Sequence, residues 1–357
     1  MKSFKYIVCC ILLALSIVPS GTFAQETGKA KDKIDVRGII FGHILDSYEW
    51  HITNFGDTKV SIPLPVIVYS QSSGWNSFLS SKIEEGASYK GFFISKNGKY
   101  KDKIVEKDAS GKEVRPFDIS LTKVSLSIIL YCILLAAIIL GVAKWYKRKE
   151  VSDAAPRGFV GFMEMFIMMI NDDVIKSCVG KDYKRFAPYL LTVFFFIFLS
   201  NLMGQIPIFP GGANVTGNIA ITFFLALCTF LAINLFGNKE YWKDVFWPDV
   251  PLWLKCPVPM MPVIEFFGVF TKPFALMVRL FANIMAGHAV ALSMICIIFV
   301  TAKMGPLMNG TLSVVSVLFA IFMGFIEVLV AFIQAYVFTM LSSVFIGLSR
   351  MEKEKEK

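Results

Sequence analysis

The sequence predicts an all-α polytopic membrane protein with five membrane-crossing helices, one interfacial helix and a small exported N-terminal segment. Of its 357 residues, 55% are hydrophobic and only 18% are charged, and the mean hydropathy is +0.61. The apolar residues come in blocks that reach the roughly 20 residues needed to cross a bilayer. The last two blocks are long enough to form a tilted antiparallel hairpin. The hydrophobic fraction and the mean hydropathy both exceed those of an ordinary soluble domain.

The N-terminus has the pattern of a signal peptide over residues 1–24. Lys2 and Lys5 precede an apolar run from Tyr6 to Val18, and Thr22-Phe23-Ala24 supplies small residues for cleavage. An uncleaved first helix is the alternative, but a run this short does not reach the length of a membrane span. Cleavage would place Gln25 outside the cytoplasm.

Residues 25–120 form a polar segment that would be exported. It carries 14 Lys and Arg, 13 Asp and Glu, and no cysteine, so no disulfide framework is expected. Val60 to Tyr69 and Tyr89 to Ile94 have strand-like composition, which is compatible with a small β-rich module. The chain's seven cysteines lie elsewhere and lack metal-ligand spacing.

The membrane domain is expected over residues 121–349. The first span is 124–143, followed by the basic and aromatic run Lys144-Trp-Tyr-Lys-Arg-Lys149, which is typical of a cytoplasmic interface. A Phe- and Met-rich stretch within about 157–183 is too short to span and is interpreted as an interfacial helix, with a half-buried core helix as the alternative. Two further spans are expected at 187–209 and 219–236.

The last two spans, 262–300 and 312–348, are unusually long. Each would reach nearly 60 Å as a continuous helix, about twice the hydrocarbon thickness, so each must tilt, bend or break. The connections assigned to the inside hold 12 Lys and Arg and the charged tail 350–357 holds 4, whereas the short outside loops hold only Lys303. This asymmetry predicts a cytoplasmic C-terminus.

Arg279 lies inside an otherwise apolar stretch of the fourth span. A guanidinium is costly to hold in a bilayer and stays protonated, so it is a functional candidate that cannot itself pass a proton on. Its sequence neighbourhood contains Asn283 and His288 but no acidic residue, which predicts a carboxylate partner on another helix or another protein. Snorkelling to the headgroups is the alternative for Arg279, and it is the favoured interpretation for Lys272.

The register of the predicted hairpin brings its few polar residues together. If the turn is centred near Pro306, facing residues have numbers that sum to about 612. Arg279 with Gln334 gives 613, and His288 with Glu327 gives 615. A buried pair of this kind can also serve only to lock the hairpin, and Gln334 can be interhelical glue.

Three motifs make this chain resemble a known family. They are Lys272-Pro-Phe-Ala-Leu-Met-Val-Arg-Leu-Phe-Ala-Asn-Ile-Met-Ala-Gly287, Phe332-Ile-Gln-Ala-Tyr-Val-Phe338 and Phe198-Leu-Ser-Asn-Leu-Met-Gly-Gln-Ile-Pro207. They are similar to subunit a of the F-type ATP synthase membrane sector, of bacterial type, over roughly residues 120–348. The Arg-Leu-Phe-x-Asn core is the most specific part.

The resemblance implies a role for each polar residue. Arg279 matches the stator arginine that faces the carboxylate of the rotating c-ring, and Asn283 and Gln334 match the polar residues beside it. Glu265 matches an acidic residue of the cytoplasmic half-channel. His288 and Glu327 fall where the family places the acid and histidine of the other half-channel, but in exchanged order relative to some bacterial members.

The same resemblance sets expectations for partners and location. Gly204 stands where some members carry an acid, so the hairpin Asn201 to Pro207 is expected to lie off the ion path. The expected partners are the c-ring, peripheral-stalk subunit b and the lipid bilayer of the bacterial inner membrane. No cofactor, metal or nucleic acid is expected, and the sequence has no Gly-x-x-x-x-Gly-Lys-Ser/Thr loop for ATP phosphates.

The implied mechanism agrees with the physical chemistry of the residues. An arginine lowers the pKa of a carboxylate brought beside it, so the proton leaves there and is regained elsewhere through an offset path. The first rival is a secondary transporter with an intramembrane Arg/His/Glu site, which would show inverted repeats that this sequence lacks. The second is a membrane-anchored binding protein, which would have no use for Arg279.

Overall fold

The computed structural model describes residues 42, 44–55, 58–71, 73–83, 87–95, 98, 100–108, 111–148, 156–206, 209–247, 260–301 and 306–350. The expected signal peptide, residues 1–24, and residues 351–357 of the expected tail lie outside the described residues. The chain divides into two compact units, of which one contains Ser47–Lys123 and the other contains Val124–Lys357.

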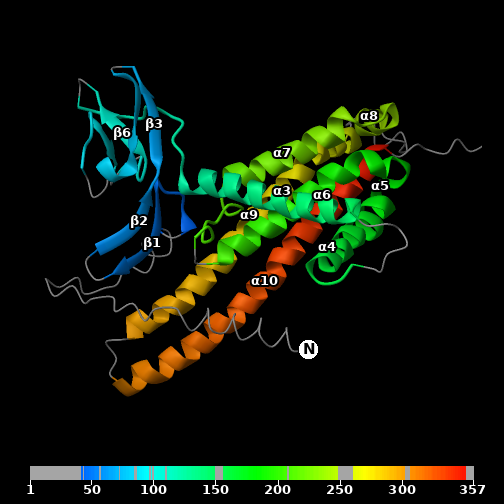
Figure 1. Cartoon of the computed structure of the whole chain (residues 1–357). Helices are drawn as coiled ribbons and strands as arrows, with labels where there is room; N and C mark the ends of the chain where they lie inside the picture. The colour runs from blue at the N-terminus through cyan, green and yellow to red at the C-terminus, as the bar shows by residue number, and fades with distance from the viewer. Residues whose placement is uncertain are drawn as a thin grey trace, which may run out of the picture. The chain divides into compact units, whose positions relative to one another are not determined.

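The first unit is built from short antiparallel strands (Figure 1). Its described residues form three sheets, with the orders β1-β2, β4-β3-β8 and β5-β6-β7. The strands are β1 (Glu49–Phe55), β2 (Thr58–Pro63), β3 (Pro65–Ser70), β4 (Gly74–Leu79), β5 (Phe92–Ile94), β6 (Ile104–Lys107), β7 (Glu113–Val114) and β8 (Phe117–Asp118), with a 3-10 turn η1 (Ser80–Lys82). The N-terminal module is therefore β-rich.

Alternation along β3 builds the core of this module. Val66 and Val68 are fully buried and pack with Phe78, Phe92 and Ile104, while the residues between them are exposed. The Tyr48 hydroxyl donates a 2.5 Å hydrogen bond to Asp118 and holds the start of the module against its last strand. Burial is the main cause that raises the pKa of Tyr48, and the Asp118 carboxylate adds to it.

The strand expected from Val60 to Tyr69 is two strands. Pro63 and Pro65 flank Leu64, and β2 ends where β3 begins. Proline has no amide donor, so a continuous ladder cannot cross this point. The Leu64 amide instead donates to the Ser80 hydroxyl at 3.1 Å, which closes the bend.

The second unit is helical. Its elements are α3 (Lys123–Lys147), α4 (Phe159–Met168), a π-helix η3 (Met169–Lys176), α5 (Ser177–Val179), a 3-10 turn η4 (Gly180–Asp182), α6 (Tyr183–Gln205), α7 (Ile219–Leu235), α8 (Lys239–Phe246), α9 (Met260–Thr301) and α10 (Pro306–Arg350). In the described part, four helical segments can cross a membrane, or five if the bent pair α7 and α8 counts as one. The predicted class of polytopic helical membrane protein is confirmed.

Helix ends differ from the expected spans for local reasons. The segment expected at 187–209 lies in α6, which starts four residues earlier at Tyr183 and ends at Gln205. Charged residues form helix outside the apolar region, so hydropathy does not mark the helix start. Ile206 is extended with ψ 113°, as expected for the residue before Pro207.

The segment expected as an interfacial helix packs onto protein along one side. Ile170, Val174 and Ile175 are buried against α6 and α10, while Phe159 and Met165 are more than half exposed. The helix passes through a π-helical stretch before it reaches α5. Gly347 of α10 crosses α5 so closely that a Cβ would lie 2.0 Å from the Cys178 carbonyl oxygen.

Helices α9 and α10 form the long antiparallel hairpin (Figure 1). Near the turn, Thr301 donates to the Asn309 side chain at 3.2 Å, and the Ser316 hydroxyl bonds to the Met294 carbonyl. At the opposite end, α9 packs on α7 and α8, and α10 packs on α6. The polar residues of the hairpin therefore lie on helices fixed at both ends.

Arg350 fastens the C-terminal end of α10. Its guanidinium bonds to Asp182 before α6, with one N–O distance of 2.8 Å, and donates to the Phe236 carbonyl at 3.0 Å and the Asn238 side chain at 3.1 Å. Asn238 returns bonds from its amides to the Ser349 and Arg350 carbonyls. This cluster, called the Arg350 clasp, ties α10 to the ends of α6 and α7.

Candidate functional site

His288 of α9 and Glu327 of α10 meet in the interior of the hairpin. Their Nδ1 and Oε1 atoms are 3.8 Å apart, and the two side chains are 18% and 14% exposed. Within the described residues, Glu327 Oε1 is buried without a hydrogen-bond partner. Gly287 lies beside the same oxygen, at a distance where a Cβ would be in ordinary contact with it at 3.4 Å. The pair can hold and exchange a proton at a nearly buried position.

Gly204, near the end of α6, lies against the same histidine. A Cβ on Gly204 would be 3.6 Å from His288 Nε2 and 3.4 Å from the Ala213 carbonyl oxygen. From the sequence, the hairpin Asn201 to Pro207 was expected to lie off the ion path because Gly204 carries no acid. In the structure this glycine borders the imidazole of His288.

Buried polar residues continue from this point along the last turns of α6 and into the loop before α7. Thr216 donates a 2.5 Å hydrogen bond to Asn201, and the Asn214 side chain accepts one from the Gly217 amide at 2.9 Å. Among the described residues, the side-chain amide nitrogens of Asn201 and Asn214 and the Ser200 hydroxyl are buried without a partner. Burying such groups unpaired costs about 1–3 kcal/mol each. The sequence signal was a set of small polar residues between two apolar spans.

Arg279 has different surroundings. It is exposed on the surface of α9, and within the described chain it has no ion pair or hydrogen bond. With Lys272 it lines a shallow groove of about 340 Å³ that is completed by Leu341 and Phe345 of α10. Asn283, one turn further on, is also exposed. The guanidinium is therefore available to a group outside this chain.

Gln334 does not join Arg279. It is 8% exposed, and no hydrogen bond connects the two side chains in this part of the molecule. Matching levels on two helices do not fix the direction of a side chain around each helix axis. Lys272, for which headgroup contact was expected, is half-buried with its Nζ 5.8 Å from the Phe345 ring centroid.

Glu265 lies near the other end of α9, where α8 packs on it. It is half-buried and close to Tyr241 of α8. Burial raises the pKa of the Tyr241 hydroxyl, and the negative charge of Glu265 adds to the increase. The hydroxyl also donates to Asn234 at 3.4 Å. Glu265 and the His288 pair therefore occupy separate surroundings on one helix.

In the described part of the chain, no group of three or more His, Cys, Asp or Glu side chains could hold a metal ion. The described cysteines, Cys132, Cys178, Cys228 and Cys296, are free.

Comparison with known proteins assigns the family. Residues 129–347 match the family model described as ATP synthase A chain, and residues 39–119 match a family described as a domain of unknown function. The ATP synthase subunit a of Chloroherpeton thalassium is 44% identical over 66% of this chain and 68% of its own length.

Two other relatives agree. Subunit a of Chlorobium phaeobacteroides strain DSM 266 is 43% identical over 67% of each chain. Subunit a of Myxococcus xanthus is 39% identical over 65% of this chain and 73% of its own length. The motif resemblance and the apolar helices indicate the same assignment: the chain belongs to the ATP synthase A chain family and is a multi-pass membrane protein.

Proposed function

We propose that this chain is the proton-conducting stator subunit of an ATP synthase, and that Arg279 removes the proton from a carboxylate of a rotating c-ring. The observation that carries the proposal is the position of Arg279. It is a permanent cation on an apolar helix, exposed on the protein surface and without an ion-pair partner among the described residues. A carboxylate that comes beside it has a lowered pKa and releases its proton.

His288 and Glu327 are proposed to lie on the half-channel that supplies protons from the outside. Their 3.8 Å separation supports exchange between them. The buried amides of Asn201 and Asn214 support a hydrated continuation of this path past Gly204, because unpaired buried polar groups are stabilised by water. Asn283 and Gln334 are proposed to assist transfer at the level of Arg279.

Glu265 is proposed to mark the exit half-channel toward the cytoplasm. It lies fourteen residues from Arg279 along α9, roughly 20 Å away at the rise of a straight helix. Because the two proposed half-channels do not join, a proton must pass from one to the other while bound to a carboxylate of the rotating c-ring. Each charge that crosses 100 mV releases about 2.3 kcal/mol, so rotation must pool several protons for each ATP.

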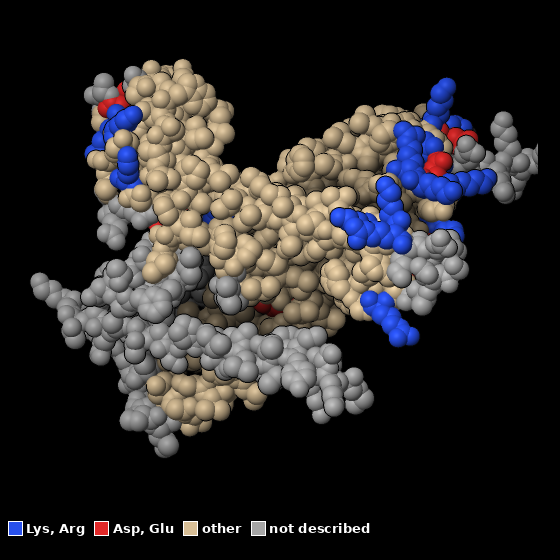
Figure 2. Space-filling view, in the orientation of Figure 1, with Lys and Arg blue, Asp and Glu red and all other residues tan. Residues whose placement is uncertain are grey.

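We also propose the orientation predicted from the sequence. Lys and Arg side chains gather at the end of the helical unit that contains α5 and α8 (Figures 1 and 2), which supports a cytoplasmic position for that end and for the C-terminus. Residues 1–24 would be removed as a signal peptide, and residues 25–120 would lie on the periplasmic side of the inner membrane. The c-ring, subunit b and lipid are the proposed partners.

The test uses Arg279→Ala and Arg279→Lys in the assembled complex. Both variants should abolish ATP synthesis driven by a proton gradient in inverted vesicles, the first by loss of charge and the second by loss of the planar donor geometry. Lys243→Gln is the matched control, because Lys243 is an exposed cation on α8 outside the proposed path. Synthesis at the wild-type rate with Arg279→Ala would refute the mechanism.

A further inference from the structure

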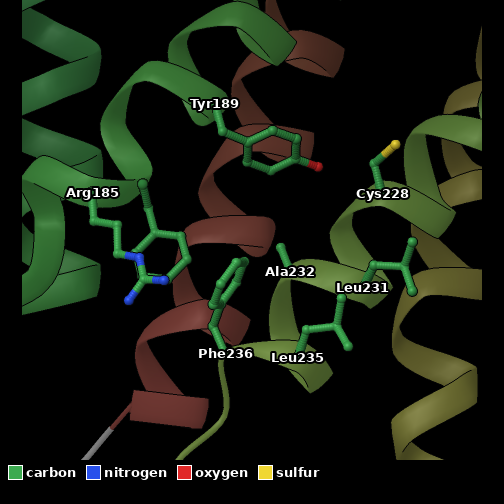
Figure 3. Close-up of a pocket in the computed structure, with 8 residues that line it drawn as sticks. Arg185, Tyr189, Cys228, Leu231, Ala232, Leu235 and Phe236 are labelled. Atoms are coloured by element: carbon green, nitrogen blue, oxygen red, sulfur yellow. The ribbon is translucent and has the colours of Figure 1, made fainter.

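An apolar groove with one cationic end lies between α6 and α7, outside the proposed proton path. It measures about 350 Å³. Arg185 and Tyr189 of α6 line one side, and Cys228, Leu231 and Leu235 of α7 line the other (Figure 3). Phe236, just beyond α7, lies at the same end as Arg185.

Arg185 provides the charge. Its guanidinium carbon is 4.5 Å from the centroid of the Phe236 ring, a stacking distance that orients the planar group without neutralising it. Arg185 is exposed, and no carboxylate of the described chain pairs with it. Arg350, close by, is committed to Asp182 and the Phe236 carbonyl. The charge of Arg185 therefore remains for an external anion.

The rest of the groove offers almost no polar chemistry. The Tyr189 hydroxyl is already bonded to Thr229 at 3.0 Å. Leu231 and Leu235 are 43% and 72% exposed, and the buried Ala232 also lines the groove. A ligand that fits must therefore be anionic at one end and hydrocarbon along its length.

We infer that this groove binds one anionic phospholipid, with its phosphate on Arg185 and an acyl chain along Leu231 and Leu235. Arginine matches phosphate geometry with two parallel hydrogen bonds, and basic sites between membrane helices recognise anionic headgroups. Other Lys and Arg side chains gather at this end of the helical unit and increase the local positive potential (Figure 2). The acyl chain would cover apolar side chains that this chain leaves exposed.

The experiment measures lipid retained by the purified, assembled complex. Complexes are reconstituted with dioleoyl phosphatidylglycerol or dioleoyl phosphatidylcholine, washed with detergent and assayed for lipid by native mass spectrometry. Phosphatidylglycerol should be retained and phosphatidylcholine lost. Arg185→Gln should reduce the retained phosphatidylglycerol about tenfold, the effect of one charge-assisted contact.

Two further variants separate charge from shape. Leu231→Trp should displace the lipid by filling the groove while Arg185 stays in place. Lys184→Gln is the control, since Lys184 is an exposed neighbouring cation that does not line the groove. Only variants that assemble in normal amount are compared, and Arg185→Lys, which keeps the charge, should retain more lipid than Arg185→Gln.

The thiol of Cys228 reports occupancy independently. Its maleimide reactivity should fall when phosphatidylglycerol is present and recover in Arg185→Gln. Equal retention of both lipids, equal loss in Lys184→Gln and Arg185→Gln, or a crosslink from Cys228 to a protein helix in the groove would each overturn the inference. None of these results bears on Arg279, so the lipid site and the proposed function fail separately.

Discussion

Exchanging His288 and Glu327 gives the sharpest test of the proposed outer half-channel. His288→Glu alone puts two carboxylates at one nearly buried position, and Glu327→His alone puts two imidazoles there. The double variant restores one acid and one histidine at the two positions, whose side chains are 3.8 Å apart in the wild-type protein. If the two residues act as a pair, the double variant should transport protons better than either single variant.

The size of the effect follows from distance and burial. Two unit charges 3.8 Å apart interact by about 1 kcal/mol in water and by about 4 kcal/mol at the effective dielectric constant of a partly buried site. Side-chain exposures of 18% and 14% favour the upper part of this range. A coupling of about 3 kcal/mol corresponds to roughly a 160-fold recovery over the product of the single defects.

The assay is proton uptake by inverted vesicles at equal complex content. Val317→Ile, at an exposed position of α10 away from the pair, controls for general effects of changes in the hairpin. Additive defects, with the double variant no faster than the product of the two singles, would show that the residues do not share a site. Transport by both singles at the wild-type rate would remove this pair from the path.

Three predictions concern stability. Gly347→Ala should destabilise the helical unit by about 1–3 kcal/mol because a Cβ would meet backbone at 2.0 Å, whereas Gly310→Ala, with nothing within 4 Å, should be neutral in thermal unfolding. Arg350→Ala should cost about 1–2 kcal/mol in thermal unfolding, because it removes hydrogen bonds to Asn238 and Phe236 and a partly exposed ion pair with Asp182. Tyr48→Phe should cost about 1 kcal/mol in chemical denaturation. Because the folded-state pKa of Tyr48 is raised, this contribution is complete below about pH 10 and is lost as pH rises above it.

The α9–α10 hairpin shows which features of the candidate site can be predicted from the sequence and which cannot. Two continuous helices of equal rise must pair by a constant sum of residue numbers, so the turn position alone placed His288 level with Glu327. The same rule placed Arg279 level with Gln334. In the structure, however, Arg279 is exposed, whereas Gln334 is buried with 8% of its surface exposed. Level along an axis follows from chain length, whereas direction around the axis depends on the neighbouring helices. The hydrophobicity of the sequence does not predict this direction of a side chain around the helix axis.

The polar residues between α6 and α7 were missed for a related reason. Asn201 falls in a motif that was expected to lie off the ion path, and Asn214 and Thr216 look like ordinary loop residues because they carry no charge. In the folded chain these residues are buried, and His288 of α9 lies against Gly204 in the same region. Gly204 lies beside His288 in this region, but a glycine has no functional group from which the sequence could predict the contact.

The position of Arg279 gives the strongest physical argument for a moving partner. An arginine can be neutralised within its own chain, and Arg350 is an example, since its guanidinium bonds to Asp182 and to two further acceptors. Arg279 is left exposed beside Lys272, with no carboxylate from the described chain. A permanent internal carboxylate would hold the arginine as a fixed ion pair and prevent it from binding successive acids. In the proposed mechanism, a counter-charge on another subunit would allow one arginine to pair with each passing carboxylate in turn.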